Sequence, residues 1–489
     1  MTTPVTADEP SARPPTPPGD GSGGSGASAG SAHGSAGSSP GLGHRLSWLG
    51  TTLWGSWPRR VLVVAVLVGF GLRLWWIVYA ARAPVGLHDP FFYLDYARRM
   101  ALGGGYRLKD GEPTAYYPIG YPGILAGWLK ITQLTPLHNH WIAATELLNL
   151  ILSTASIALA GILGRRLAGP WVGALTAVIV ALFPSLIYHS ATILTETTFN
   201  FVFLVTLLVL CWQPWTERVP SWGRLVVFGL LLGLSIEIRP IALLVVPMVL
   251  IALWRRGGAS LALRRWALVV AVVVAVMIPW TVRNAVVMKA FLPIGTTTGD
   301  NLCIGNFPGA EGHFAFPTWC FGHDPKVKRP AFETIRNSTL THQSLTWAEH
   351  HPGRELALVV DRTRWEFASD HDGVSAVQSY GDDPFIPPDR ATTLGNIGDT
   401  YFYVVGVLAL LGIPLLLRGG DRRRLFLLLA IVAVIISVWP FFGDPRFHVP
   451  INVLMPVPAA LLVVTVAGAV RTKLTQRRLS GLRQSRRVS

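Results

Sequence analysis

Hydrophobic residues occur along the chain in long runs separated by short polar connections. The first run, 61–80, is long enough to cross a membrane, because a helix needs about 20 residues to span roughly 30 Å of hydrocarbon. Later runs lie near 139–163, 170–190, 194–212, 222–238, 240–254, 266–282, 397–417, 425–440 and 449–470. The pattern therefore predicts an all-α membrane protein built as a bundle of about ten transmembrane helices. The two runs that flank Arg239 are short, so we expect broken or tilted helices there.

Cationic residues mark one set of the short connections. By the positive-inside rule these connections face the cytoplasm, and with about ten spans both termini do so too. The arginines concerned are Arg59, Arg60, Arg165, Arg166, Arg255, Arg256, Arg264, Arg265 and Arg422 to Arg424. By the same alternation, the long segments 81–138 and 283–396 and the short turns near 191, 239 and 441–448 face outward.

Composition divides the chain into three parts. Residues 1–44 are rich in Gly, Ser, Ala and Pro and have few large apolar groups, which predicts a disordered cytoplasmic tail. Residues 45–470 form the membrane domain, and 471–489 form a basic cytoplasmic tail. Within the domain, apolar spacing over 346–369 predicts one or two amphipathic helices in the second long outward segment.

The net charge of +15 does not indicate a nucleic-acid-binding protein. Much of the basic excess lies in the predicted cytoplasmic loops and tail, where topology and contact with anionic membrane lipids explain it. The sequence contains no P-loop and no dinucleotide-binding fingerprint. This argues against an ATP-driven pump and against an enzyme that uses nucleotide sugars in the cytosol.

The three cysteines differ in their placement. Cys303 and Cys320 both belong to the second outward segment, where an oxidising compartment permits a disulfide. Two unrelated buried thiols are the alternative. Neither cysteine has a second Cys or His pair at a spacing that would complete a zinc site, and no metal centre is predicted. Cys211 lies at the inner end of a span and is expected to be a packed thiol.

Ionisable residues recur at the outer ends of the predicted spans. Asp89 follows the first span, Glu196 begins the fourth, Arg239 lies between the fifth and sixth, and Arg446 precedes the last. A carboxylate can deprotonate a hydroxyl, and arginines can neutralise a departing lipid phosphate. Arg73 lies deep in the first span, where a cation needs a partner or an aqueous cavity, and an acid such as Glu237 could pair with it.

Five stretches of the sequence, in the same order, resemble the sequence motifs of GT-C-type membrane glycosyltransferases. The resemblance is strongest to the bacterial branch related to protein O-mannosyltransferases and to the aminoarabinose transferase of lipid A, and it covers most of residues 60–465. The stretches are DPFFYLDYARRMALGGGYRLKDGEPTAYYPIGYPGILAG, ATILTETTFNF, GLSIEIRPIALLVVP, IPWTVRNAVVMKAFLPIGTTTGDNLCIGNFPGAEGHF and GDPRFHVPINVLMP.

The resemblance implies transfer of a sugar from a polyprenyl-phosphate donor to a cell-envelope acceptor at the outer face of the plasma membrane, with inversion at the anomeric carbon. Asp89 matches the family's acid in the first loop and Glu196 its second acidic position. Many relatives have two adjacent acids where this chain has His88 and Asp89, so the second acid is absent or replaced by Asp95. The remaining candidates are Arg446, Arg239 and Arg283 for the donor phosphate and His88, Tyr93 and His448 for support.

Other interpretations remain open at this point. Asp89 could be the N-cap of a helix that starts with Pro90, and Glu196 could serve only in an interfacial ion pair. The whole chain could be a transporter or flippase of lipid-linked saccharides, or a polymerase or ligase of glycan chains. No cofactor is required by the resemblance; a divalent metal is conceivable, but the branch resembled generally needs none.

Overall fold

The computed structural model describes residues 56–215, 219–254, 258–321 and 325–488, with side chains described as far as 477. Over these residues the secondary structure is helical, and isolated bridges such as Arg107 with Pro113 are the remaining regular pairing. The protein is therefore all-α. The predicted tail at 1–44 lies outside the described residues, and the boundary at 471 falls inside the continuous last helix.

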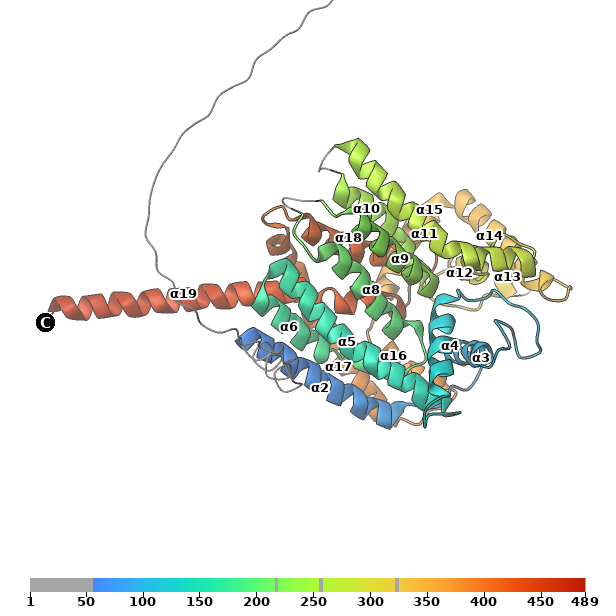
Figure 1. Cartoon of the computed structure of the whole chain (residues 1–489), viewed down its shortest axis with the longest axis horizontal. Helices are drawn as coiled ribbons and strands as arrows, with labels where there is room; N and C mark the ends of the chain where they lie inside the picture. Colours follow the sequence, from blue (N-terminus) through green and yellow to red (C-terminus); the bar gives the residue numbers. More distant parts are fainter. Residues whose placement is uncertain (1–55, 216–218, 255–257, 322–324, 489) are drawn as a thin grey trace, which may run out of the picture. The chain divides into compact units, whose positions relative to one another are not determined.

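Each predicted span contains at least one helix (Figure 1). These helices are α2 (Trp57–Ala80), α5 (Trp141–Ala168), α6 (Pro170–Ala181), α8 (Thr195–Cys211), α9 (Trp222–Ile238), α10 (Val245–Leu253), α11 (Ala259–Val287), α17 (Pro388–Leu417), α18 (Arg422–Ile436) and α19 (Pro456–Val488). Among the described residues, however, 5 helices are long and apolar enough to cross a membrane alone, and up to 6 if a bent pair is one span.

Proline breaks and burial account for the shorter helices. The run at 170–190 is divided by Pro184 into α6 and the short α7 (Pro184–Tyr188), with a bend of 58°. The run at 240–254 likewise divides into the 3₁₀ helix η2 (Pro240–Leu244) and α10. Helix α8 has 17 residues and is buried over most of its surface, so it is covered by other helices along its length. The expectation of broken or tilted helices around Arg239 agrees with this arrangement.

The helices pack in a series in which each one contacts the next. Helix α2 packs on α5 and α6, α5 on α8, α8 on α9, and α9 on α11, while α17 packs along α19 (Figure 1). Small residues permit the closest of these approaches. A Cβ on Gly173 of α6 would lie 2.4 Å from the carbonyl oxygen of Gly161 in α5, so a side chain at 173 would force the two helices apart.

Arg73 in α2 is stabilised by backbone carbonyls. Its guanidinium donates to Gly69, Val180 and Ala181 carbonyl oxygens at 3.1 Å each. The expected ion pair with Glu237 is therefore wrong. The regular hydrogen bonding of α6 ends at Ala181, so the carbonyls of its last turn can accept from Arg73 and take the place of the acid.

The two long segments predicted to face outward pack on each other. The first contains α3 (Asp89–Ala101) and α4 (Gly120–Thr132). The second contains α12 (Thr297–Gly305), α13 (Thr318–Phe321), α14 (Ala331–His350), α15 (Pro352–Glu366), α16 (Asp372–Ala376) and the 3₁₀ turn η3 (Ser379–Gly381). Glu333 of α14 accepts hydrogen bonds from the Ala115 amide at 2.8 Å and the Thr114 hydroxyl at 2.9 Å. The amphipathic helices expected over 346–369 are the end of α14 and α15.

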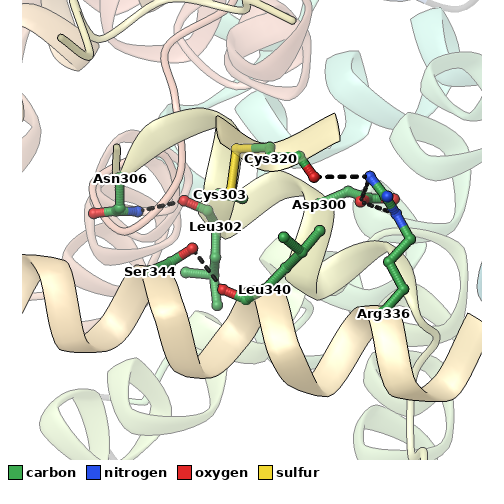
Figure 2. The surroundings of a disulfide bond; sticks show 8 residues. All are labelled: Asp300, Leu302, Cys303, Asn306, Cys320, Arg336, Leu340 and Ser344. Carbon is green, nitrogen blue, oxygen red and sulfur yellow. Dashed lines mark hydrogen bonds and ion pairs between the residues drawn. A yellow bond between two sulfur atoms is a disulfide. The ribbon is translucent and has the colours of Figure 1, made fainter. Parts of the chain in front are cut away.

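A disulfide joins α12 to α13 (Figure 2). Cys303 and Cys320 are both buried and pack with Leu340 of α14. Arg336 of α14 pairs with Asp300 at 3.0 Å beside this bridge. The structure thus contains the bridge that the sequence predicted, and it closes the loop between α12 and α13 where these helices pack on α14.

We expect Cys303→Ser to lower the free energy of unfolding by about 3 kcal/mol, because the bridge closes a loop between residues 17 apart in sequence. The thermal unfolding temperature of the oxidised chain in detergent measures this change. Cys211→Ser is the matched control, since Cys211 is a buried free thiol. An equal drop in both variants would mean that loss of the bridge itself is not the cause.

Candidate functional site

Four of the predicted site residues form a continuous chain of ion pairs. Arg446 donates from Nη1 to Asp89 Oδ2 at 2.6 Å and from Nε to Glu196 Oε1 at 2.5 Å. Arg239 donates from Nη1 to the same Glu196 oxygen at 2.8 Å. Two carboxylates and two guanidiniums thus alternate, and we call Asp89, Arg446, Glu196 and Arg239 the acid–arginine cluster.

Helix ends bring the cluster together. Asp89 is the first residue of α3, and Glu196 lies in the first turn of α8. Arg239 ends α9 next to Pro240, and Arg446 is in the first turn of the 3₁₀ helix η4 (Pro445–Val453). A proline lies next to Asp89, Arg239 and Arg446, where it begins or ends a helix because its ring removes an amide donor and fixes φ. Side chains at such breaks can turn toward one another instead of projecting sideways from a long helix.

The members of the cluster differ in exposure. Side-chain exposure is 31% for Asp89 and 15% for Arg446, but 7% for Arg239 and 0% for Glu196. Asp89 is therefore the carboxylate that a substrate could reach. Glu196 lies behind the two arginines, where it fixes their direction and balances their charge.

Asp89 does not have the capping role considered from the sequence. His88 is the N-cap of α3, and no side chain accepts a hydrogen bond there. The Asp89 carboxylate is instead held by Arg446 and by the Tyr117 hydroxyl, which donates to Oδ1 at 2.5 Å. Because the carboxylate is not occupied by the amides of its own helix, it stays directed at the cluster.

Asp444 fixes the backbone of Arg446. Its carboxylate accepts the Arg446 amide at 2.9 Å and so caps η4. Burial, together with the negative charge of Asp372, raises the pKa of Asp444 to about 6. Burial alone would lower the pKa of Arg446, but the carboxylates of Glu196 and Asp89 raise it well above its usual value. The guanidinium is therefore charged at any pH at which the protein is folded.

Tyrosines surround the cluster. Tyr93, a predicted supporting residue, is buried and packs on Tyr117 and Tyr121 with ring centroids 4.7 and 5.1 Å apart. Burial and the charge of Asp89 raise the pKa of Tyr93 and of Tyr117 well above 10. These phenols are neutral donors, so Tyr117 can donate to Asp89 without competing for its proton.

Tyr380 is a site residue that the sequence did not indicate. It comes from η3 and its backbone is left-handed, with φ of 53°, which is uncommon for a bulky residue. Its ring lies 5.5 Å from that of His88, the residue before Asp89, and burial raises the pKa of its hydroxyl. That hydroxyl has no hydrogen-bond partner among the described residues. No motif or hydropathy pattern marks this residue, because a left-handed turn gives no signal in the side-chain type.

Four residues considered from the sequence lie outside the cluster. Arg283 donates to the carbonyl oxygens of Thr114 and Tyr106 at 2.6 and 2.8 Å, so it fastens α11 to the first outward segment. His88 pairs with Asp382 at 3.0 Å, and buried His448 bonds Asp370 at 2.9 Å. Asp95, considered as a second acid, pairs with Arg99 one turn along α3 and does not join the cluster.

The cluster does not fit a metal ion. Across the described residues, no group of three or more His, Cys, Asp or Glu side chains is placed to hold one. The oxygens of Asp89 and Glu196 that face the cluster already accept guanidinium or phenol protons. The groups in the cluster that suit an anionic ligand such as a phosphate are the two guanidiniums, because arginine binds phosphate through a planar fork.

Glu366 provides a pH test of the structure beside this site. Both its carboxyl oxygens are buried without a hydrogen-bond partner among the described residues, and burial raises its pKa to about 9. Neutral Glu366 contributes fully to the stability of the fold at pH values below the usual pKa of a glutamate. This contribution is lost as the pH rises toward 9. Between pH 5 and 8, we expect the free energy of unfolding of the native chain to fall with each pH unit by up to about 1.4 kcal/mol more than that of Glu366→Gln. Thermal unfolding across this range measures the difference; parallel curves for the two proteins would contradict it.

No protein-family model and no curated protein matches the chain. Solved structures do match. The Archaeoglobus fulgidus oligosaccharyltransferase in its apo form is 13% identical with a TM-score of 0.52, and the match covers 87% of this chain and 52% of that one. The same enzyme, AglB, with an inhibitory peptide and a dolichol-phosphate is 15% identical with a TM-score of 0.51 and the same coverage.

ArnT from Cupriavidus metallidurans bound to undecaprenyl phosphate is 14% identical with a TM-score of 0.49, covering 83% of this chain and 60% of that one. The chain spans about half the length of the archaeal structures that it matches. The two archaeal matches extend over nearly all of the membrane bundle, and a likeness at this identity concerns the fold. The chain is thus a multi-pass membrane protein with the GT-C glycosyltransferase fold.

Proposed function

We propose that this protein transfers a sugar from a polyprenyl-phosphate donor to a hydroxyl or amine acceptor at the outer face of the plasma membrane, during assembly of a cell-envelope glycan, glycolipid or glycoprotein. The acid–arginine cluster is the observation that carries the proposal. It combines a reachable carboxylate with two arginines, the groups needed to deprotonate an acceptor and to receive a lipid phosphate. The dolichol-phosphate named for the archaeal neighbour, AglB, agrees with this chemistry.

The geometry supports a single displacement. Asp89 accepts the proton of the acceptor O–H while that oxygen attacks the anomeric carbon. The bond from the anomeric carbon to the phosphate oxygen breaks, and polyprenyl phosphate leaves with the electron pair. Attack opposite the leaving group inverts the anomeric carbon.

Arg446 connects the two halves of this step. In the resting cluster, its Nη1 donates to Asp89. When Asp89 takes up the acceptor proton, its charge is neutralised and its attraction for Arg446 weakens. The guanidinium is then available to the phosphate at the moment when negative charge develops there. Arg239 assists from the far side of Glu196, and Glu196 is a positioning residue that holds both arginines.

Contacts between the basic loops support the outward orientation of the cluster. Arg424 in the first turn of α18 donates to the Leu167 carbonyl at the end of α5, and Arg166 lies 3.9 Å from the ring of Trp212 after α8. These loops therefore lie together, at helix ends opposite to those that carry Asp89, Glu196 and Arg239. By the positive-inside rule, the arginine-rich ends face the cytoplasm and the cluster faces outward.

The donor is tested by supplying membranes that contain the native chain with a panel of radiolabelled polyprenyl-phosphate sugars. Release of polyprenyl phosphate together with labelled product supports the transferase. Movement of intact labelled donor between leaflets without release would support a transporter or flippase instead. A polymerase or ligase would accept only donors that carry whole glycan chains.

A further inference from the structure

A buried hydrogen-bond network holds η4, the 3₁₀ helix that carries Arg446. His448 of η4 is two residues after Arg446 and is fully buried. Its Nε2 lies 2.9 Å from Oδ1 of buried Asp370, and its Nδ1 lies 2.5 Å from the carbonyl oxygen of Glu366. The helix with the arginine is thus bonded through one ring to the end of α15 and the segment that follows it.

Both nitrogens of the His448 ring face acceptors. A backbone carbonyl oxygen can only accept, so Nδ1 carries a proton. Oδ1 of Asp370 also accepts from Asn452 Nδ2 at 2.8 Å, and an ionised carboxylate oxygen has two lone pairs for two such donors. With Asp370 ionised, Nε2 carries a proton as well. The hydrogen bonds therefore favour an imidazolium paired with a carboxylate.

Two aromatic rings pack against the His448 ring. Phe402 is stacked on it with centroids 4.5 Å apart and an interplanar angle of 28°, and Phe367 with centroids 5.5 Å apart and an angle of 15°. The face of an aromatic ring attracts a cation at such distances. The stacking therefore stabilises the charged form of the ring and restricts its rotation.

Asp370 balances the charge of His448, although other ionisable groups lie nearby. Burial raises the pKa of Glu366 to about 9, so its carboxyl is uncharged at neutral pH. Asp399 accepts the backbone amide of Asp370 at 2.6 Å and pairs with His371 at 3.0 Å. The bonds of Asp399 fix the backbone from which the Asp370 carboxylate reaches the ring.

The same segment, 366–372, also reaches the helix that carries Glu196. A carboxylate oxygen of Asp372 lies 3.5 Å from Nε2 of buried His189. The His189 carbonyl oxygen accepts the hydroxyl of Thr197 at 3.1 Å, and Thr197 follows Glu196 in the first turn of α8. The segment is thus connected to η4 on one side and to α8 on the other.

Helix η4 needs outside support because its own hydrogen bonds are weak. It extends over 9 residues, whereas 3₁₀ helices longer than about three or four residues are uncommon because their hydrogen-bond geometry is poor. Pro445 and Pro450 also lack amide donors. Arg446 reaches Asp89 and Glu196 at once, so a small rotation of η4 would break one of these two bonds.

We propose that the buried ion pair of Asp370 and His448 positions the guanidinium of Arg446 by fixing the rotation of η4. Both are positioning residues, which act through Arg446 and take no part in the chemistry. The consequence for the rate rests on the proposed sugar transfer, whereas the position of the guanidinium can be measured without it.

Nitrogen NMR tests the ion pair and the positioning directly. The full-length chain, labelled with ¹⁵N-histidine and ¹⁵N-arginine, is measured in nanodiscs at neutral pH, and His448→Gln and Arg446→Lys assign the two signals. We expect two protonated ring nitrogens for His448 and a shift of the Arg446 Nε resonance in His448→Gln. A His448 ring with one unprotonated nitrogen, or an Arg446 resonance that does not move, would overturn the inference.

His448→Gln should also lower kcat for sugar transfer by up to about a hundredfold, the cost of misplacing a reacting group by about 1 Å. The donor KM should change little, because Arg446 is bonded to Asp89 in the resting cluster and meets the phosphate only during the reaction. His371→Gln is the matched control, since His371 pairs with Asp399 at a site that is 40% exposed. It should change neither the rate nor the Arg446 resonance. A raised donor KM with unchanged kcat in His448→Gln would contradict the proposal.

Asp370→Asn keeps the shape of the side chain and serves as a second variant if His448→Gln does not fold. Asparagine can still accept from Asn452, but it lacks the charge that balances the second proton on the ring. The His448 ring should then lose a proton, and kcat should fall as it does in His448→Gln. An unchanged ring and an unchanged rate would exclude the ion pair.

Combination with Arg446→Lys separates positioning from a general loss of structure. If His448 acts through Arg446, the double variant should be about as slow as Arg446→Lys alone, because a lysine has no fork to direct. Losses that multiply would mean that His448 supports the fold elsewhere, and the positioning role would be rejected.

The two measurements keep the inference apart from the proposed function. Sugar transfer by a native chain whose Arg446 resonance does not respond to His448→Gln would leave the transferase standing and reject the positioning. A responding resonance in a chain that transfers sugar from no donor would support the positioning and reject the transferase.

Discussion

Asp89→Asn should reduce kcat for sugar transfer by about a thousandfold, within the range that a positioned general base contributes. The amide cannot accept the acceptor's proton. It can still accept the Tyr117 hydroxyl, but an amide NH₂ beside Arg446 replaces an ion pair with two donors that face each other. The variant should fold, because the Asp89 side chain is 31% exposed and does not cap its helix. Radiolabelled donor supplied to membranes with equal amounts of each protein measures the rate.

Asp110→Asn is the matched control for this variant. Asp110 lies in the same outward segment, is exposed, and accepts the Glu112 amide in a turn, a bond that asparagine can also make. The rate of transfer should not change. A rate for Asp89→Asn that equals that of the control would remove Asp89 from the chemistry, even if it contacts the donor.

Rescue by pH would distinguish a base from a structural carboxylate. If Asp89 removes the acceptor's proton, the residual rate of Asp89→Asn should rise with pH, because hydroxide or an ionised acceptor then replaces the base. The native rate should depend less on pH, because its carboxylate takes the proton and hydroxide is not needed. If the two pH profiles have the same shape, Asp89 contributes by holding Arg446 and not by proton transfer.

The sequence predicts the helical bundle because hydrophobic runs of sufficient length have few alternatives in a membrane. It also predicts that acids and arginines gather at the outer helix ends. It does not predict which of them meet. Arg283 and Arg239 both lie at the outer end of a predicted span. Arg239 nevertheless pairs with Glu196, while Arg283 donates to carbonyls of the first outward segment. The difference depends on where α11 packs, and no residue pattern along one helix encodes that.

The sequence gives no signal for Tyr380. A left-handed turn places its ring 5.5 Å from that of His88, the residue before Asp89. For Arg73 the sequence predicts the wrong kind of partner. An acid is expected, but the end of α6 at Ala181 supplies backbone carbonyls that accept from the guanidinium instead.

Arg446→Lys should lower kcat/KM for the donor about a hundredfold, although the charge is kept. Arginine reaches Asp89 through Nη1 and Glu196 through Nε at the same time, because its donors form a rigid fork. A lysine ammonium is a point charge on a flexible stem, and it would be drawn to one carboxylate or the other. The phosphate would then lack a fixed partner, and misplacement by about 1 Å can cost a hundredfold in rate. Steady-state kinetics with the donor varied measures the effect. The control is Arg224→Lys, at a half-buried arginine that donates to Gln213 away from the cluster.

The double variant Asp89→Asn/Arg446→Lys decides whether the two residues act as one unit. Groups in direct contact are not additive, and here proton uptake by Asp89 is what releases Arg446 to the phosphate. If that link is correct, the double variant should be little slower than Asp89→Asn alone, because an arginine that is never released contributes little. Full additivity, with the two losses multiplied, would mean that Arg446 binds the phosphate independently of the proton. The cluster would then be two sites that share a salt bridge, and Glu196, which holds Arg446 and Arg239 from behind, would organise only the phosphate site.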